Sequence, residues 1–349
     1  MAGKYRLITD RLELELKKMR AEGRTRLPSE QELATRFSCS RQTVRASLEV
    51  LRQKGLIEKR KGSGSYLAED TFNNKTIFFI TEDCDRYQSP AMISGLKEML
   101  ASSGYGLRAF STGGTYQAEA GILTQVISER PAALVIEPSR DLVPNPDSRL
   151  TAEIAALGIP VIYCNSTSGP VHVTPDNVEG GRILTKQLLD PGSKKTACIF
   201  RIDSSTGRDR YQGYIDALMD FDADFDESMC LLITHEDEKE IISGKGDKLS
   251  AFVDNNLSGC GSVICQNGMI AHRMVNLLDN RGINVPQDIA VACFDNGYYA
   301  DDGIISLGYD NDHFCKMLAK TVEALAGGRS ASSAAVPWIS IPSNQRIPG

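Results

Sequence analysis

The chain has 349 residues, 41% hydrophobic and 24% charged, a balance that excludes disordered and fibrous classes and suits two or three globular domains of ~100 to 200 residues. The net charge of −6 is divided unequally, because residues 1–70 carry 16 Lys and Arg against 10 Asp and Glu, and the remainder carries 23 against 35. The net positive charge of the N-terminal segment therefore favours binding to a polyanion, and the net negative charge of the rest of the chain does not.

Membrane insertion, disulfides and metal sites are not expected. No run of residues approaches the ~20 apolar residues of a membrane-spanning helix, and charged residues open the chain where a signal peptide needs an apolar run. The nine cysteines are scattered without a C-x-x-C pair and with only four histidines beside them. We therefore expect a cytoplasmic protein with buried, reduced thiols and without a metal site.

Residues 1–69 predict a small helical domain that ends in a hairpin. Apolar residues at helical spacing over 5–21 predict a first helix. Ser29 followed by Glu32 is a capping box, which predicts that a second helix begins there. A third helix is expected over 41–54, between a capping serine and a glycine.

The first turns of the third helix carry side chains suited to DNA. In a helix-turn-helix the N-terminal part of the recognition helix meets the base edges, and arginine pairs bidentately with guanine. Two short strands at 56–60 and 66–68 enclose a glycine-rich tip, which predicts a wing that approaches a groove or a phosphate. The residues expected to contact DNA are Arg41, Gln42, Thr43 and Arg45 on the helix and Lys61, Gly62 and Ser63 at the tip.

This segment resembles the GntR family of regulators. The matching residues are Leu27-Pro28-Ser29-Glu30-x-Glu32-Leu33-Ala34, Ser40-Arg41-x-Thr43-Val44-Arg45, Leu51, Gly55-Leu56-Ile57 and Gly62-x-Gly64-Ser65. The resemblance implies a winged helix-turn-helix. It also implies DNA contacts from Arg41, Arg45, the helix start near Glu30, and the wing.

Residues 70–75 are short and polar and are expected to link this domain to a larger α/β domain at 76–349. Short apolar runs there alternate with amphipathic segments, which predicts doubly wound parallel sheets with right-handed crossovers. The expected strands are 76–81, 106–111, 133–137, 160–165, 197–202, 262–266 and 289–294. The expected helices include 91–102, 180–189, 210–219 and 270–281.

Polar residues stand at the carboxyl ends of five of these strands: Glu137, Asn165, Asp203, Asn267 and Asp295. Ligands of open parallel sheets bind beyond those ends. Converging donors and acceptors in a cleft are costly unless something satisfies them. We therefore expect a small-molecule site there, and we expect Trp338, the only tryptophan, to serve packing between domains.

The larger domain resembles the LacI-type effector domain, which is similar to periplasmic binding proteins, over residues 76–345. The matching residues are Gly104-Tyr105, Asp176-Asn177-x-x-Gly180-Gly181, Arg210-x-x-Gly213-Tyr214, Asn267, and Val285-Pro286-x-Asp288-Ile289-Ala290-Val291-x-x-Phe294-Asp295-Asn296. The resemblance implies two lobes with an effector between them. It implies that Arg210, Asn267 and Asp295 bind this effector.

A GntR-type head on a LacI-type sensor is similar to the arabinose repressors. Further agreement lies in Tyr87 with Pro90, Ile136-Glu137-Pro138-Ser139-Arg140, Asn145-Pro146 and Ile199-Phe200-Arg201-x-Asp203. The resemblance implies that Glu137 helps to hold a sugar. The expected ligand-binding residues are Tyr87, Glu137, Asn165, Asp203, Arg210, Asn267 and Asp295.

We therefore expect a homodimeric repressor that binds a double-stranded DNA operator and is released by a small sugar such as L-arabinose. Effector binding shifts the DNA equilibrium only by its differential affinity for the two states, typically ~1 to 3 kcal/mol. The alternative is a regulator of the same architecture that senses a nucleoside or another polar metabolite, or that activates. A fused aminotransferase would need a longer body and a lysine for its cofactor, so neither enzyme activity nor a cofactor is expected.

Overall fold

The computed structural model describes residues 24–53, 56–60, 63–67, 75–143, 146, 148–189, 195–294 and 303–341, and positions 8, 9, 11, 12, 15, 16 and 19. Contacts between Cα atoms divide the chain into two units, residues 1–75 with 327–330 and residues 76–326 with 331–349. Among the described residues, no helix is long and apolar enough to cross a membrane.

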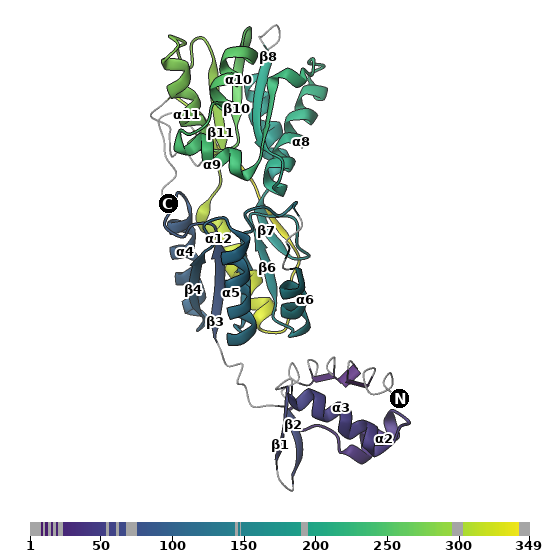
Figure 1. Cartoon of the computed structure of the whole chain (residues 1–349). Helices are drawn as coiled ribbons and strands as arrows, with labels where there is room; N and C mark the ends of the chain where they lie inside the picture. Colours follow the sequence, from purple (N-terminus) through teal and green to yellow (C-terminus); the bar gives the residue numbers. More distant parts are fainter. Residues whose placement is uncertain are drawn as a thin grey trace. The chain divides into compact units, whose positions relative to one another are not determined.

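Two helices and a hairpin lie within residues 24–67 of the first unit, as far as the structure describes them (Figure 1). The helices are α2 (Glu30–Arg36) and α3 (Arg41–Gln53), and the antiparallel strands are β1 (Ile57–Arg60) and β2 (Gly64–Leu67). These elements confirm the second helix, the third helix and the hairpin that the sequence predicts. The predicted first helix falls largely outside the described residues.

The predicted capping box fixes the start of α2. The Ser29 hydroxyl accepts a hydrogen bond from the Glu32 backbone N–H at 3.3 Å, and the Glu32 carboxylate accepts one from the Ser29 backbone N–H at 2.7 Å. Leu33, Val44 and Leu51 are fully buried, so α2, α3 and the hairpin share one small core.

The second unit contains two six-stranded sheets in two lobes (Figure 1). In lobe 1 the strand order is β13-β7-β6-β5-β3-β4, and in lobe 2 it is β14-β12-β11-β10-β8-β9. The strands of lobe 1 are β3 (Thr76–Thr81), β4 (Gly106–Ser111), β5 (Ala133–Ile136), β6 (Val161–Cys164), β7 (His172–Pro175) and β13 (Ala334–Val336). Those of lobe 2 are β8 (Lys195–Arg201), β9 (Cys230–Ile233), β10 (Cys260–Cys265), β11 (Ala290–Phe294), β12 (Ile305–Gly308) and β14 (Ile339–Ile341).

Helices cover both sheets. Lobe 1 contains α4 (Ser89–Ser102), α5 (Tyr116–Glu129), α6 (Ser148–Ala156) and α12 (Asn311–Ala326). Lobe 2 contains α7 (Asn177–Leu188), α8 (Ser205–Asp220), the 3-10 turn η1 (Glu227–Met229), α9 (His235–Ser243), α10 (Lys248–Asn256) and α11 (Gly268–Asp279). The doubly wound architecture is therefore confirmed. Within these two sheets, the described strand pairs are parallel except β12 with β14.

In each sheet, the strand that comes first in the chain has the next two strands on opposite sides of it, so the direction in which strands are added reverses there. In lobe 1 β3 lies between β4 and β5, and in lobe 2 β8 lies between β9 and β10. A doubly wound sheet binds ligands beyond the carboxyl ends of its strands at such a reversal. The fold therefore places one binding edge in each lobe.

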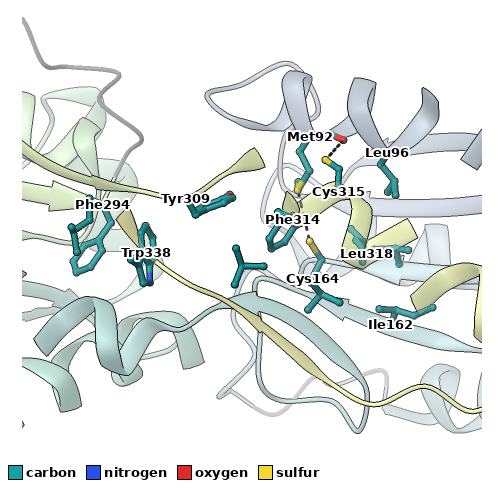
Figure 2. Close-up of a cluster of buried hydrophobic side chains, with 14 of the residues drawn as sticks. Met92, Leu96, Ile162, Cys164, Phe294, Tyr309, Phe314, Cys315, Leu318 and Trp338 are labelled. Carbon is teal, nitrogen blue, oxygen red and sulfur yellow. Dashed lines mark hydrogen bonds between the residues drawn. The ribbon is translucent and has the colours of Figure 1, made fainter. Parts of the chain in front are cut away.

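The chain passes between the lobes at residue 176, at 309–310 and at 337–338, and aromatic rings pack at the last two passages (Figure 2). The centroid of the Trp338 ring lies 5.2 Å from that of Phe294 and 5.5 Å from that of Tyr309. Tyr309 in turn lies 5.3 Å from Phe314 at the start of α12. These rings join the cores of the two lobes.

Glycines bring α7 and α8 into close contact. A Cβ atom at Gly181 would lie 2.2 Å from the backbone oxygen of Arg210, and one at Gly213 would lie 1.9 Å from that of Val178. Real Cβ atoms do not approach backbone oxygens so closely. The Gly181 and Gly213 positions of the sequence motifs are therefore requirements of this helix crossing.

We predict that Gly213→Ala destabilises the protein by about 2 kcal/mol or more, because backbone atoms of α7 would have to move. Gly121→Ala is the control, since Gly121 also lies in a helix and a Cβ there would meet nothing within 4 Å. The control is expected to be stabilising by about 0.5 kcal/mol, from helix propensity. Urea unfolding measures both, and equal effects of the two variants would contradict the close crossing.

Candidate functional site

A cleft of about 260 Å³ opens between the two binding edges of the second unit. Residues that follow β3, β5 and β6 line it from lobe 1, and residues that follow β8 and β10 line it from lobe 2. Most of the lining side chains are polar. Those discussed below are Thr81, Glu82, Tyr87, Glu137, Asn165, Arg201, Arg210, His235, Glu238, Asn267 and Trp338.

Arg210 forms the floor of the cleft. Its Nε donates to Asn177 Oδ1 at 3.0 Å, and its Nη1 donates to the backbone oxygen of Gln266 at 2.5 Å. The guanidinium lies over the rings of Phe294 and Trp338, at 4.2 and 5.4 Å. Burial lowers the pKa of Arg210 to about 10, so the group remains a cation at neutral pH. Arg210 therefore lines the cleft as a buried cation held by two hydrogen bonds.

On the lobe 1 side, Glu137 is held by two donors. Thr81 Oγ1 donates to one of its carboxylate oxygens at 2.5 Å, and Asn165 Nδ2 donates to the other at 2.7 Å. Each carboxylate oxygen has two lone pairs, so Glu137 can still accept from a ligand hydroxyl. The chain thus fixes an acceptor at the end of β5.

Two residues on this side have backbone angles that side chains rarely adopt. Tyr87 has a φ of 57° and Asn165 a φ of 51°. Such left-handed residues cost about 1 kcal/mol or more and collect at ligand sites. Both line the cleft, which supports its assignment as a binding site.

On the lobe 2 side, Glu238 links two further residues. Asn267 Nδ2 donates to one of its oxygens at 2.6 Å, and Arg201 Nη1 donates to the other at 2.8 Å. The side chains of Arg201 and Glu238 are only 12% and 10% exposed. Glu238 and Asn267 therefore present a second fixed acceptor and amide, opposite those of lobe 1.

Residues 139–142, which follow β5 in lobe 1, contact lobe 2 one after another. Arg201 donates to the backbone oxygen of Ser139, and the Ser205 backbone N–H donates to Asp141 at 2.7 Å. The Arg140 guanidinium lies 3.6 Å from the Glu236 carboxylate, and the Leu142 backbone N–H donates to the backbone oxygen of Asp203 at 3.3 Å. We call this segment the lobe-contact segment, because each of its four residues contacts lobe 2.

His235 lies at the start of α9, and its side chain is 1% exposed. Neither ring nitrogen has a hydrogen-bond partner among the described residues, and its Nδ1 lies 3.8 Å from a Glu82 oxygen. Burial, together with the nearby Arg201 and Lys239, lowers the pKa of His235 to about 4. Burial and the Glu238 charge raise the pKa of Glu82.

The structure brings most of the predicted ligand residues together. Tyr87, Glu137, Asn165, Arg210 and Asn267 all line the cleft. Asp203 does not line it, because its carboxylate accepts from Arg201 Nε at 3.1 Å and from the His235 backbone N–H at 2.9 Å. Asp295 lies outside the described residues.

Several lining residues were not predicted. Glu238 and His235 lie on α9, after a short strand that the sequence analysis did not identify. Trp338 was expected to serve packing, yet it both packs against Phe294 and lines the cleft. Trp338 has both roles because it lies where the chain passes from lobe 1 to lobe 2. A lone tryptophan in a sequence does not indicate such a position.

In the first unit, Glu30 organises the predicted DNA-contacting arginines. Its carboxylate accepts from Arg45 Nε at 2.7 Å and lies 3.8 Å from Arg41 and 3.6 Å from Lys59. The hydrogen bond from Arg45 lowers the pKa of Glu30. The Arg41 and Arg45 side chains are 58% and 62% exposed, so they are held in place and remain accessible.

The other predicted DNA-contacting residues lie beside them or on the hairpin. Gln42 is exposed. The Thr43 side chain and backbone N–H both form hydrogen bonds with the Ser40 hydroxyl, which caps α3. The exposed Ser63 lies 2.6 Å, oxygen to oxygen, from the Tyr66 hydroxyl. Lys61 and Gly62 lie outside the described residues. Across the described residues, no group of three or more His, Cys, Asp or Glu could hold a metal ion.

Comparisons with protein families match both parts of the chain. Residues 4–67 match "Bacterial regulatory proteins, gntR family". Residues 74–345 match "Periplasmic binding proteins and sugar binding domain of LacI family". The second match covers well over half of the chain.

Curated relatives and solved structures that are similar to the chain include the following three. An "Arabinose metabolism transcriptional repressor" of Halalkalibacterium halodurans is 27% identical over 78% of this chain and 75% of its own, and one of Geobacillus stearothermophilus is 28% identical over 79% and 77%. A periplasmic binding protein/LacI transcriptional regulator from Alkaliphilus metalliredigens, solved with D-xylulofuranose, is 18% identical with a TM-score of 0.65, over 78% of this chain and all of its own. The last likeness shows the shared fold.

We predict that His235 makes stability depend on pH. Its pKa is lower in the folded protein than in the unfolded chain, so the unfolded state binds more protons between pH 6.5 and pH 4. Stability is then fully present above pH 6.5, and about 2 to 3 kcal/mol is lost as the pH falls to 4. Urea unfolding of the wild type and of His235→Asn measures this loss, and the variant is expected to lose less stability over the same range.

The control is His313→Asn, because His313 is exposed on α12. Its pH dependence is expected to match that of the wild type. A His235→Asn variant with the same pH dependence as the wild type would show that His235 is protonated alike in the folded and unfolded states.

Proposed function

Because the chain belongs to the family of periplasmic binding proteins and LacI-type sugar-binding domains, and carries a GntR-type segment before it, we propose that it is a transcriptional repressor controlled by a sugar. In this proposal the N-terminal domain, residues 1–69, binds DNA. Residues 70–75 link it to the effector domain, residues 76–349. The chain acts by binding and not as an enzyme, in keeping with its named relatives.

The observation that carries the sugar assignment is the chemistry of the cleft. Glu137 and Glu238 face it from opposite lobes, each already held by a donated amide hydrogen bond. Carboxylates in such positions accept hydrogen bonds from hydroxyl groups and repel phosphates. Trp338 and Phe294 add apolar faces, and Arg210 adds a donor at the floor. A neutral molecule with several hydroxyl groups satisfies all of these groups at once.

L-arabinose is the ligand that we propose. A cleft of about 260 Å³ is at the small end of ligand sites and suits one sugar ring better than the two ring systems of a nucleoside. Two of the curated relatives are named for arabinose metabolism, and they support the same choice. In this proposal Tyr87, Glu137, Asn165, Arg210 and Asn267 contact the sugar. Asp295, which lies outside the described residues, belongs to the same proposed set.

We further propose that two chains act together and that the sugar releases the DNA. Two copies of the N-terminal domain would read two half-sites, which multiplies the affinity of each. The sugar would bridge groups of both lobes and so favour one separation of the two copies over another. The response is limited by the difference in sugar affinity between the DNA-bound and free states.

We predict that L-arabinose raises the thermal midpoint of the protein and changes the emission of Trp338. A ligand at a hundred times its Kd stabilises by ~2.7 kcal/mol, and Trp338 is the only tryptophan of the chain. Glu137→Gln is expected to weaken binding at least tenfold, because a charged acceptor is lost (about 1.5–3 kcal/mol). Glu153→Gln, at an exposed position on α6, is the matched control.

The same titrations with D-xylose, D-ribose and adenosine separate the alternatives. A response to adenosine and none to any sugar would mean that the ligand class is wrong while the fold assignment stands. A Glu137→Gln variant that binds L-arabinose as tightly as the wild type would remove Glu137 from the site.

We predict that Arg45→Ala abolishes specific DNA binding and changes the free energy of unfolding by less than about 1 kcal/mol, because Arg45 is an exposed contact residue. The probe is a duplex selected by the wild-type protein from a random-sequence pool, and binding is measured by fluorescence anisotropy. Arg52→Ala is the control, since Arg52 is equally exposed at the other end of α3 and pairs with Glu49.

The selected sequences test the two-chain arrangement at the same time. An inverted repeat is expected, and a single short motif would contradict it. Arg45→Ala binding the selected duplex as tightly as Arg52→Ala would mean that α3 is not the recognition helix.

A further inference from the structure

A second cavity, of about 390 Å³, lies in lobe 1 beside the cleft. It is formed by the start of α5, the start of α6 and the segment that follows β5. Pro138, Ser139 and Asp141 line both this cavity and the cleft. The second cavity is therefore a separate space that shares one wall with the proposed sugar site.

Two buried polar atoms at this cavity have no hydrogen-bond partner among the described residues, the Tyr116 hydroxyl and the Arg140 Nε. The Arg140 guanidinium lies over the Tyr116 ring at 4.2 Å, and its Nη2 donates to the Gly114 backbone oxygen at 3.2 Å. The arginine is thus fixed in place while one of its donors stays unused. Buried polar atoms without partners are uncommon in folded proteins and often mark sites that a ligand completes.

The charges around the cavity exclude an anion as its ligand. Of the described residues that line it, Glu119 and Asp141 are acidic and Arg140 alone is basic, and Arg140 already lies 3.6 Å from Glu236. Glu119 is 8% exposed, so its charge acts at short range in a poorly solvated place. A phosphate or carboxylate would meet more negative than positive charge.

The remaining lining is apolar or carries hydroxyl groups. Tyr116 and Tyr163 contribute aromatic rings, Ile136 and Leu142 contribute aliphatic side chains, and Thr151 contributes a hydroxyl. Rings with polar edges beside acceptors and donors suit a molecule with both hydroxyl groups and apolar faces.

We propose that this cavity is a second small-molecule site, which binds a neutral hydroxylated compound of the size of a monosaccharide or cyclic polyol. Tyr116 and Arg140 donate to the ligand, Glu119 accepts from its hydroxyl groups, and the tyrosine rings pack on its apolar faces. The site goes beyond the proposed function, because that function requires only the cleft between the lobes.

The shared wall gives the second site a means of acting on the first. Ser139, Arg140, Asp141 and Leu142 line the second cavity, and each of them contacts lobe 2. A ligand that orders these residues favours the closed arrangement of the lobes. The two ligands would then change each other's affinity by the same factor.

The test uses saturation-transfer NMR on the full chain with myo-inositol, D-glucose and D-ribose, and with glucosamine and glucose 6-phosphate as charged counterparts. Two variants each place a ring in one cavity. Thr151→Phe fills the second cavity, where the Thr151 hydroxyl donates a hydrogen bond to the backbone oxygen of Ser148 in its own helix. Ser89→Phe fills the cleft from the first turn of α4.

At least one neutral compound is expected to keep its signal in Ser89→Phe and to lose it in Thr151→Phe. Tyr116→Phe, which keeps the shape of the cavity, is expected to weaken that compound's binding about two- to tenfold through the loss of one hydrogen bond. The proposal is overturned if every neutral signal depends on the cleft, if only charged compounds bind in the second cavity, or if Tyr116→Phe binds unchanged. Near-ultraviolet circular dichroism verifies that each variant is folded.

Discussion

The burial of Arg210 is the interaction on which the effector domain depends. Its guanidinium joins the start of α7 through Asn177, the end of β10 through Gln266, the end of β11 through Phe294 and the passage between lobes through Trp338. A buried cation is costly unless hydrogen bonds surround it. Elements that are far apart in the sequence are therefore held in one arrangement, because each supplies part of what this group requires.

The same requirement explains the neighbouring glycines. Arg210 reaches Asn177 only because α7 and α8 cross closely, and that crossing needs Gly181 and Gly213. Gly180 has a related role, since a Cβ there would lie 2.5 Å from the Trp338 indole nitrogen. The motifs at 176–181 and 210–214 are thus one packing arrangement that ends in a buried cation at the cleft.

Local sequence rules predicted the regular elements well and the site only partly. The seven predicted strands are present within two residues of their expected ends, because buried parallel strands are continuous apolar runs. Strands β7, β9, β12 and β13 were not predicted, since they are short or carry mixed polarity. Asp203 was expected to face the ligand, but its carboxylate accepts hydrogen bonds from Arg201 and from the backbone of α9. These contacts depend on how the elements pack, which the position of a residue at a strand end does not reveal. Glu238 was missed for the same reason.

The passages of the chain between the lobes also set the order in which the protein is made. Lobe 1 is completed only by α12 and β13, and lobe 2 only by β14, which ends at Ile341. The DNA-binding unit, in contrast, has its last strand at Gly64–Leu67. At synthesis rates of roughly 5–20 residues per second, tens of seconds separate the two events on the ribosome. Each newly made chain therefore has the described helices and strands of its first unit well before it has the cleft between the two lobes.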